Sequence, residues 1–309
     1  MKWAEITVEC PPESADAICY ALSQVGCGGA AIQGQSPVRV RGYLPVSDEL
    51  TMRVDELRRR LFSLADAGLP PPLAELTLKT VEDEDWEHAW KQYFKPVRIG
   101  RRFIIKPSWE FYSPQTDDLV IELDPGMAFG TGGHPTTRLC LAALEDTVKS
   151  GDIVADIGTG SGILAIGAAR LGAARVFATD IDALPCRIAR ENVERNRLFD
   201  TISVLEPPLF NAAAAGCDVV VANIVANTIV ELAPTVAPRL KPGGLFIASG
   251  IVEEHAELVS DALKAAQLAP LEVRREEIWV CLIARRTDRP IVSAGLAAAR
   301  EALPPLQEL

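Results

Sequence analysis

A glycine-rich segment near the middle of this 309-residue chain carries the residue types best suited to bind a ligand. It reads Asp156-Ile157-Gly158-Thr159-Gly160-Ser161-Gly162. Glycine lets a backbone approach a ligand closely because no Cβ intrudes. A dinucleotide fingerprint places its third glycine three residues after the second, where this chain has Ile163, so the spacing argues against that class of ligand.

The apolar residues before this segment predict a buried strand, and those after it predict a helix with Ser161 as its N-cap. The spacing D-x-G-x-G-x-G resembles motif I of class I S-adenosylmethionine-dependent methyltransferases. That cofactor has no phosphates, and a carboxylate such as Asp156 suits its ammonium and sulfonium groups. A glycine turn that binds no ligand is the alternative interpretation.

A second glycine-rich segment, residues 124–137, ends in His134-Pro135-Thr136-Thr137. Four glycines within eight residues predict a turn-rich loop, and Pro135 suits the first turn of a helix. Backbone N–H groups at a helix start and threonine hydroxyls can bind polar ligand atoms. His134 has two interpretations, either a general base or a residue that caps the helix and packs.

Two polar residues end predicted strands farther along the chain. Asp180 lies 22 residues after Gly158, near the spacing at which an acid meets ribose hydroxyls in doubly wound folds. Asp182 is predicted to cap the following helix. Asn223 ends an apolar strand and is expected at the carboxyl edge of the sheet, although asparagine also ends strands as a turn residue.

The order of elements around these residues predicts an α/β protein with two domains. The first part follows a β-α-β-β-α-β order, which is the ferredoxin-like arrangement. Alternating strands and helices then predict a Rossmann-like sheet of seven mostly parallel strands with an antiparallel edge. The predicted boundaries are a ferredoxin-like domain at 1–80, a linker helix at 81–97, the larger domain at 98–288 and a tail without assigned function at 289–309.

Composition limits the possible functions. The chain is 48% hydrophobic and 24% charged, as globular proteins are, and has no apolar run of about 18 residues, so we expect no membrane span. Seven cysteines form no C-x-x-C pair, which predicts reduced thiols, a cytoplasmic location and neither disulfides nor a metal site. The net charge of −11 argues against direct nucleic-acid binding and is compatible with a basic protein partner. We expect a monomer.

Four motifs together resemble the PrmA family, whose members methylate large-subunit ribosomal protein eleven. They are A-F-G-T-G-x-H-P-T-T, D-x-G-x-G-S-G-I-L-A-I, D-I-D and V-V-A-N-I, and the H-P-T-T block is the discriminating one. The resemblance runs from the start of the chain to about residue 285. It implies an enzyme that uses S-adenosylmethionine and whose N-terminal domain holds the ribosomal protein. It also implies that the acceptors are lysine ε-amines and an α-amine.

The same resemblance directs the choice of site residues. Asn223 matches the position that contacts the cofactor and the incoming amine, and we assign catalytic roles to Asn223 and Thr137. The expected cofactor-binding residues are Phe129, Thr131, His134, Thr137, Asp156, Gly158, Gly160, Gly162, Asp180 and Asn223. The signature N-P-P-Y of adenine and glutamine methylation is absent, since Ile224 and Val225 stand where its prolines would be.

Methyl transfer in line from a sulfonium to a neutral amine needs little acid–base help, which agrees with the lack of an obvious base. Three alternatives stay open. One is a lysine methyltransferase that acts on another protein. Another is a nicotinamide-dependent dehydrogenase, against which Ile163 argues. The third is a non-catalytic assembly factor that keeps the cofactor pocket.

Overall fold

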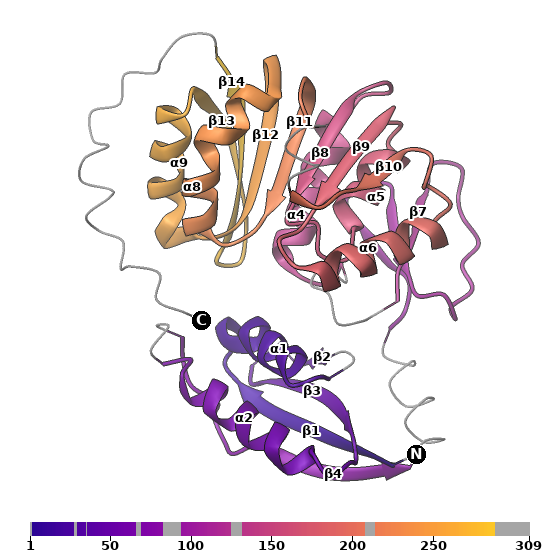
Figure 1. The fold of residues 1–309 in the computed structure, drawn as a ribbon, viewed down its shortest axis with the longest axis vertical. Coiled ribbons are helices and arrows are strands. Elements are labelled where there is room, and N and C mark those ends of the chain that lie inside the picture. Colours follow the sequence, from indigo (N-terminus) through magenta and orange to yellow (C-terminus); the bar gives the residue numbers. More distant parts are fainter. Residues whose placement is uncertain are drawn as a thin grey trace. The chain divides into compact units, whose positions relative to one another are not determined.

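The computed structural model describes two compact units (Figure 1). The described residues are 2–27, 30–34, 36–65, 69–82, 94–124, 132–207 and 214–287. One unit contains Met1–Pro96 with two short later segments, and the other contains most of the chain from Val97 onward.

The N-terminal unit is a four-stranded antiparallel sheet with two helices. Its elements are β1 (Lys2–Cys10), α1 (Ala15–Gln24), β2 (Ala30–Gln33), β3 (Val38–Pro45), α2 (Leu50–Phe62) and β4 (Thr77–Glu82). The strand order β2-β3-β1-β4 is that of the ferredoxin-like arrangement and confirms the prediction. Alternate residues of β1, such as Ile6 and Val8, are fully buried in one cluster with Leu22 of α1 and Leu57 of α2. The period-2 alternation of β1 therefore places one row of its side chains on the face of the sheet that the helices cover.

The second unit is built on a seven-stranded sheet. In spatial order its strands are β10 (Ile202–Val204), β9 (Arg175–Thr179), β8 (Ile153–Ile157), β11 (Cys217–Asn223), β12 (Leu240–Val252), β14 (Trp279–Arg286) and β13 (Leu268–Glu276). The pairs from β10 to β12 are parallel, and β14 is antiparallel to both of its neighbours. This is the predicted class I methyltransferase order, with an antiparallel pair at one edge.

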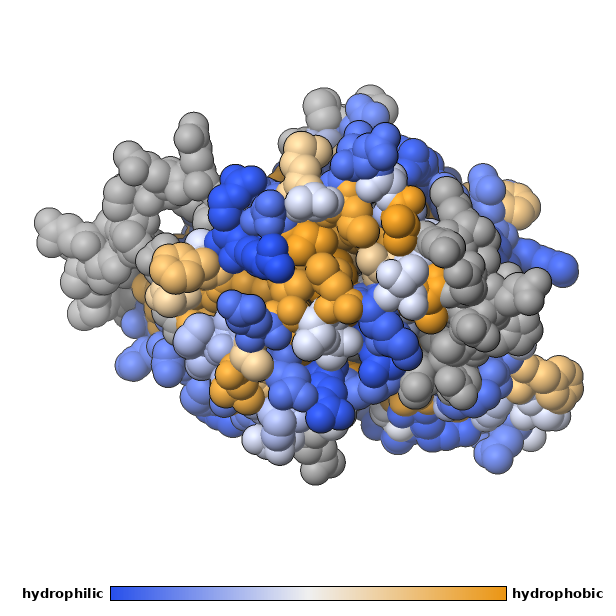
Figure 2. Space-filling view, turned by 90° about the horizontal axis from the view of Figure 1, so that it is seen from below, coloured by the Kyte–Doolittle hydropathy of each residue, from blue (hydrophilic) through white to orange (hydrophobic). Residues whose placement is uncertain are grey.

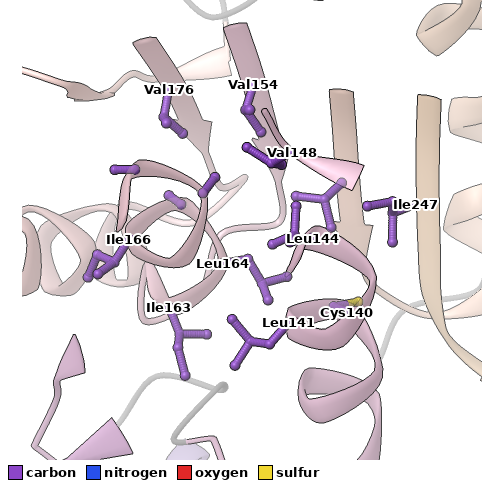
Figure 3. Packing of buried hydrophobic residues seen from close by; sticks show 14 of the residues in the cluster. Cys140, Leu141, Leu144, Val148, Val154, Ile163, Leu164, Ile166, Val176 and Ile247 are labelled. Carbon is purple, nitrogen blue, oxygen red and sulfur yellow. The ribbon is translucent and has the colours of Figure 1, made fainter. Parts of the chain in front are cut away.

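Helices cover both faces of this sheet (Figure 1). They are α4 (Pro135–Thr147), α5 (Ile163–Arg170), α6 (Ala183–Arg195), α8 (Ala226–Val236) and α9 (Ala256–Ala265). A smaller sheet, β5 (Val97–Ile99), β6 (Phe103–Lys106) and β7 (Leu119–Glu122), adds to the cluster that contains α4 and α5. Figure 3 shows Leu141 and Leu144 of α4 beside Leu164 of α5.

The topology determines where a ligand site forms. From β8 the chain first builds outward to β9 and β10, then returns to place β11 on the other side of β8. The connections at the carboxyl ends of β8 and β11 therefore diverge, and doubly wound folds bind their ligands in the crevice at such a switch point. Asp156, near the end of β8, and Asn223, at the end of β11, lie at this edge.

Several predicted features fall partly or wholly outside the described residues. These are most of the linker helix, at 83–93, and the tail at 289–309. The ends of the predicted linker segment are strands, because β4 extends to Glu82 and β5 begins at Val97. Within the part of the chain that the structure describes, no helix is long and apolar enough to cross a membrane.

A substitution at Phe103 tests how the second unit is packed. Its side chain is fully buried in the cluster shared by α4, α5 and the sheet. We expect Phe103→Ala to lower the free energy of unfolding by about 3–5 kcal/mol, because it leaves a cavity. The matched control is Phe199→Ala, since Phe199 is 62% exposed. Urea denaturation measures both variants, and equal losses would contradict the packing described here.

Candidate active site

The loop between β8 and α5 has a backbone that requires glycine. Gly158, Gly160 and Gly162 have φ angles of 75°, 54° and 85°, which L side chains rarely adopt. A Cβ at Gly158 would overlap the side chain of Ile224, and one at Gly162 would lie 3.3 Å from the Cβ of Ala189. Close packing against the residue that follows β11 and against α6 therefore adds to the conformational requirement.

Two carboxylates hold this loop in place. Asp156 Oδ2 accepts hydrogen bonds from the Thr159 hydroxyl at 2.7 Å and from the Ala165 N–H at 3.1 Å. Asp180 Oδ2 accepts from the Gly160 N–H at 3.0 Å. The acids that the sequence assigned to cofactor contacts thus also brace the loop, and their direct contact with a ligand stays a prediction.

Asp156 has an unusual electrostatic environment. It is fully buried, and this burial raises the pKa of its carboxyl to about 7, with a smaller contribution from the negative charge of Asp180. The hydrogen bonds from Thr159 and Ala165 act in the opposite direction. Its other oxygen, Oδ1, is buried and has no hydrogen-bond partner among the described residues. A proton on the carboxyl can be accommodated there.

The two residues predicted to be catalytic meet across the crevice. Asn223 Nδ2 at the end of β11 donates to Thr137 Oγ1 in the first turn of α4, at 3.5 Å. Thr137 is fully buried. Asn223 Oδ1 is buried without a partner in the described ranges, so the residues there leave its acceptor capacity unused. The sequence separates these residues by 86 positions, and α4 brings them together.

His134 adopts the second of the roles that the sequence left open. It is the N-cap of α4, where its Nδ1 accepts from the Thr136 N–H at 3.2 Å and lies 2.6 Å from the Thr136 hydroxyl. Its ring also packs edge-on against Trp279, with centroids 4.8 Å apart and planes at 72°. Capping and packing therefore explain His134 without a role as general base.

Two predicted helix caps differ from the structure. Ser161 is not the N-cap of α5, because the helix begins at Ile163 and Gly162 takes the cap position in the left-handed conformation. Asp182 occupies the N-cap position of α6 without a side-chain cap bond. Instead, Asp180 Oδ1 accepts from the Asp182 N–H at 3.3 Å. The predicted cofactor residues Phe129 and Thr131 lie outside the described residues.

Gly250 and Trp279 also lie at this edge of the sheet, and no motif of the sequence indicates them. Gly250 has a φ of 85°, and a Cβ there would overlap the backbone of Ile224. The available signal was its position directly after the apolar strand 245–249. Trp279 begins β14 opposite Val252, at the same edge of the sheet as the other site residues. Both residues belong to strands, β12 and β14, that contain none of the sequence motifs.

Comparisons with known proteins all find similarity to methyltransferases of ribosomal protein L11. The family described as "Ribosomal protein L11 methyltransferase (PrmA)" matches residues 2–287. A ribosomal protein L11 methyltransferase of Pelotomaculum thermopropionicum is 46% identical over 92% of this chain and 99% of its own length. One from Exiguobacterium sibiricum is 39% identical over 93% and 99%. The crystal structure of ribosomal protein L11 methylase from Lactobacillus delbrueckii subsp. bulgaricus has 35% identity and a TM-score of 0.59, covering 63% of this chain and 100% of that chain.

The raised pKa of Asp156 predicts a pH-dependent stability. The folded-state pKa of Asp156, about 7, lies above the ordinary value of 3.8. At a pH between these two values, the carboxyl is protonated in the folded state and ionised in the unfolded state. The resulting stabilisation is fully present below the ordinary pKa and is lost as pH rises through the folded pKa.

Asp156→Asn removes this titration and keeps an acceptor for Thr159 and Ala165. Relative to the unsubstituted chain, its free energy of unfolding should therefore rise by roughly 2–4 kcal/mol between about pH 4 and pH 8. Urea denaturation at several pH values measures the difference. Parallel stability curves for the two proteins would contradict the assigned pKa.

Proposed function

The chain belongs to the ribosomal protein L11 methyltransferase family, and from this membership we propose that it transfers methyl groups from S-adenosylmethionine to amino groups of ribosomal protein L11. The proposed acceptors are lysine ε-amines and the N-terminal α-amine. The observation that best supports this chemistry is the pairing of Thr137 with Asn223 beside the glycine loop.

The residues around the switch point fit S-adenosylmethionine. Their glycines leave the backbone without Cβ atoms where a ligand must come close. Ile181, directly after Asp180, is 90% exposed and offers an apolar surface to a base. When bound, this cofactor supplies a methyl group on a positively charged sulfur. We propose that it contacts the following residues: Phe129, Thr131, His134, Thr137, Asp156, Gly158, Gly160, Gly162, Asp180 and Asn223.

Asn223 is the residue best placed to orient the acceptor amine. Because Thr137 Oγ1 accepts from its Nδ2, the carboxamide is held with Oδ1 available as an acceptor. An amine N–H that donates to Oδ1 would keep the nitrogen lone pair directed away from that bond. Orientation of this kind contributes much of the rate enhancement of a bimolecular transfer. Thr137 acts in this proposal by fixing the Asn223 amide.

The amine must lose its proton before it can attack. Burial disfavours an ammonium ion, and a neighbouring cation disfavours it further, so both lower the pKa of the acceptor. A strong base is therefore not required. His134 is not needed as one, since its Nδ1 already accepts from the backbone of Thr136.

The N-terminal unit is the proposed recognition module for the ribosomal protein, with the boundaries predicted from the sequence. Several of its large apolar side chains are exposed, including Phe62 at 85%, Leu73 at 59% and Leu78 at 47%. Figure 2 shows apolar side chains exposed among polar ones in the view that it draws. Exposed apolar surface of this kind favours a protein partner. We propose that the enzyme acts as a cytoplasmic monomer on this basic substrate, to which its net charge of −11 is complementary.

The substrate is tested by intact-mass analysis of purified ribosomal protein L11 after incubation with this protein and S-adenosylmethionine. We expect mass increments of whole methylene groups that map to lysines or to the N-terminal amine. A second basic ribosomal protein serves as the control and should stay unmodified. An unchanged mass of L11, with cofactor binding still detectable by calorimetry, would contradict the proposed substrate.

The catalytic pair is tested by two substitutions measured at saturating cofactor. We expect Asn223→Ala to lower kcat about 100-fold and Thr137→Val about 10-fold, because the amine loses its orientation. The matched control is Thr147→Val at the other end of α4, where the hydroxyl donates to the Ala143 carbonyl of the same helix. Unchanged turnover of Asn223→Ala would remove that residue from the mechanism.

A further inference from the structure

Arg138 joins three segments at the edge of the crevice. Its Nε donates to Glu276 Oε1 at 2.7 Å, and its Nη1 donates to the Gly133 carbonyl. Gly133 lies at the end of the glycine-rich segment, Arg138 in the first turns of α4, and Glu276 at the end of β13. One guanidinium thus connects the loop, the helix and the β13–β14 hairpin.

Neighbouring contacts join the same segments. Gly133 precedes His134, whose ring packs on Trp279, the first residue of β14. At the other end of α4, Asp146 pairs with Arg274 of β13 at 2.8 Å. The hairpin therefore holds α4 at both ends, and the Arg138 contact is at the end that faces the crevice.

The position of the N-terminal end of α4 matters because Arg138 directly follows Thr137, one of the two proposed catalytic residues. Thr137 is the preceding residue, and its 3.5 Å contact with Asn223 is at the outer limit of a hydrogen bond. A small displacement of the first turn of α4 would break that contact. Misplacement of about 1 Å in a group remote from the chemistry can lower turnover about 100-fold.

Stability does not by itself explain the ion pair. The side chains of Arg138 and Glu276 are 32% and 35% exposed. Ion pairs that are partly solvated contribute little to the free energy of unfolding. The bond to the Gly133 carbonyl adds a geometric constraint, since a planar guanidinium donates in fixed directions.

We propose that Arg138 and Glu276 are positioning residues for methyl transfer, which hold Gly133 and the first turn of α4 against the β13–β14 hairpin so that Thr137 stays aligned with Asn223. This inference rests on the proposed function. It assigns a role to a hairpin that lies outside every motif of the sequence.

The test compares Arg138→Met, Glu276→Leu and the double variant. We expect each single variant to lower kcat for methylation of ribosomal protein L11 about 10-fold, with the Kd for S-adenosylmethionine changed less than about 2-fold. Because both substitutions break the same contact, the double variant should be no slower than the slower single variant. The matched control is Arg275→Met. Arg275 precedes Glu276 on β13, and its Nε and Nη2 donate to the carboxylate of Glu253 at 2.8 Å and 3.1 Å.

Hydrogen exchange gives a second measurement that needs no substrate. Peptides covering residues 132–138 should exchange faster in Arg138→Met than in Arg275→Met. A kcat equal to that of the control, or purely additive losses in the double variant, would overturn the inference. If the unsubstituted protein does not methylate L11, the proposed function fails, and equal exchange in the two variants would then separately overturn the positioning role.

Discussion

The site depends on the close approach of three strand ends around one residue, Ile224. Its side chain occupies the space that a Cβ at Gly158 would need, and its backbone occupies the space that a Cβ at Gly250 would need. Both glycines have positive φ angles. The ends of β8, β11 and β12 can converge at the switch point only because neither flanking position has a side chain. Convergence brings Asn223 of β11 beside the glycine loop of β8.

A buried carboxylate completes this arrangement. Asp156 is taken out of water without an ion-pair partner among the described residues, which is unfavourable for its charged form. In return, its Oδ2 orders both the turn, through Thr159, and the start of α5, through Ala165. A neutral hydrogen-bonding residue could make the same two contacts. Folding of the loop therefore does not by itself require an acid at this position, which is consistent with the cofactor contact proposed for Asp156.

The helix α4 carries several of the polar groups at the crevice. Its cap, its first-turn threonine and its arginine all lie within five consecutive residues. The helix packs on the same core as α5 and the central strands (Figure 3), so these groups stand on a rigid element. Rigid support suits a reaction in which the protein orients reactants and supplies little acid–base chemistry.

The sequence by itself determined the elements and the identity of the central loop. Alternation in β1, the apolar run of β11 and the three glycines after Asp156 are local patterns, and local steric rules convert them directly into strands and a positive-φ turn. The resemblance of the motifs was enough to indicate the family and the donor. Thr137 and Asn223 were identified in the same way, as separate members of two motifs.

Only the tertiary structure decided which groups meet. Ser161 looked like a helix cap because cap statistics are local, but Gly162, which lies close to Ala189 of α6, takes the cap position in the left-handed conformation. The sequence could not distinguish His134 as a base from His134 as a cap. In the structure, its Nδ1 accepts from the Thr136 N–H and its ring packs against Trp279. Arg138 and Glu276 are 138 residues apart. Contacts over such separations depend on strand order and register, which no local pattern in the chain encodes.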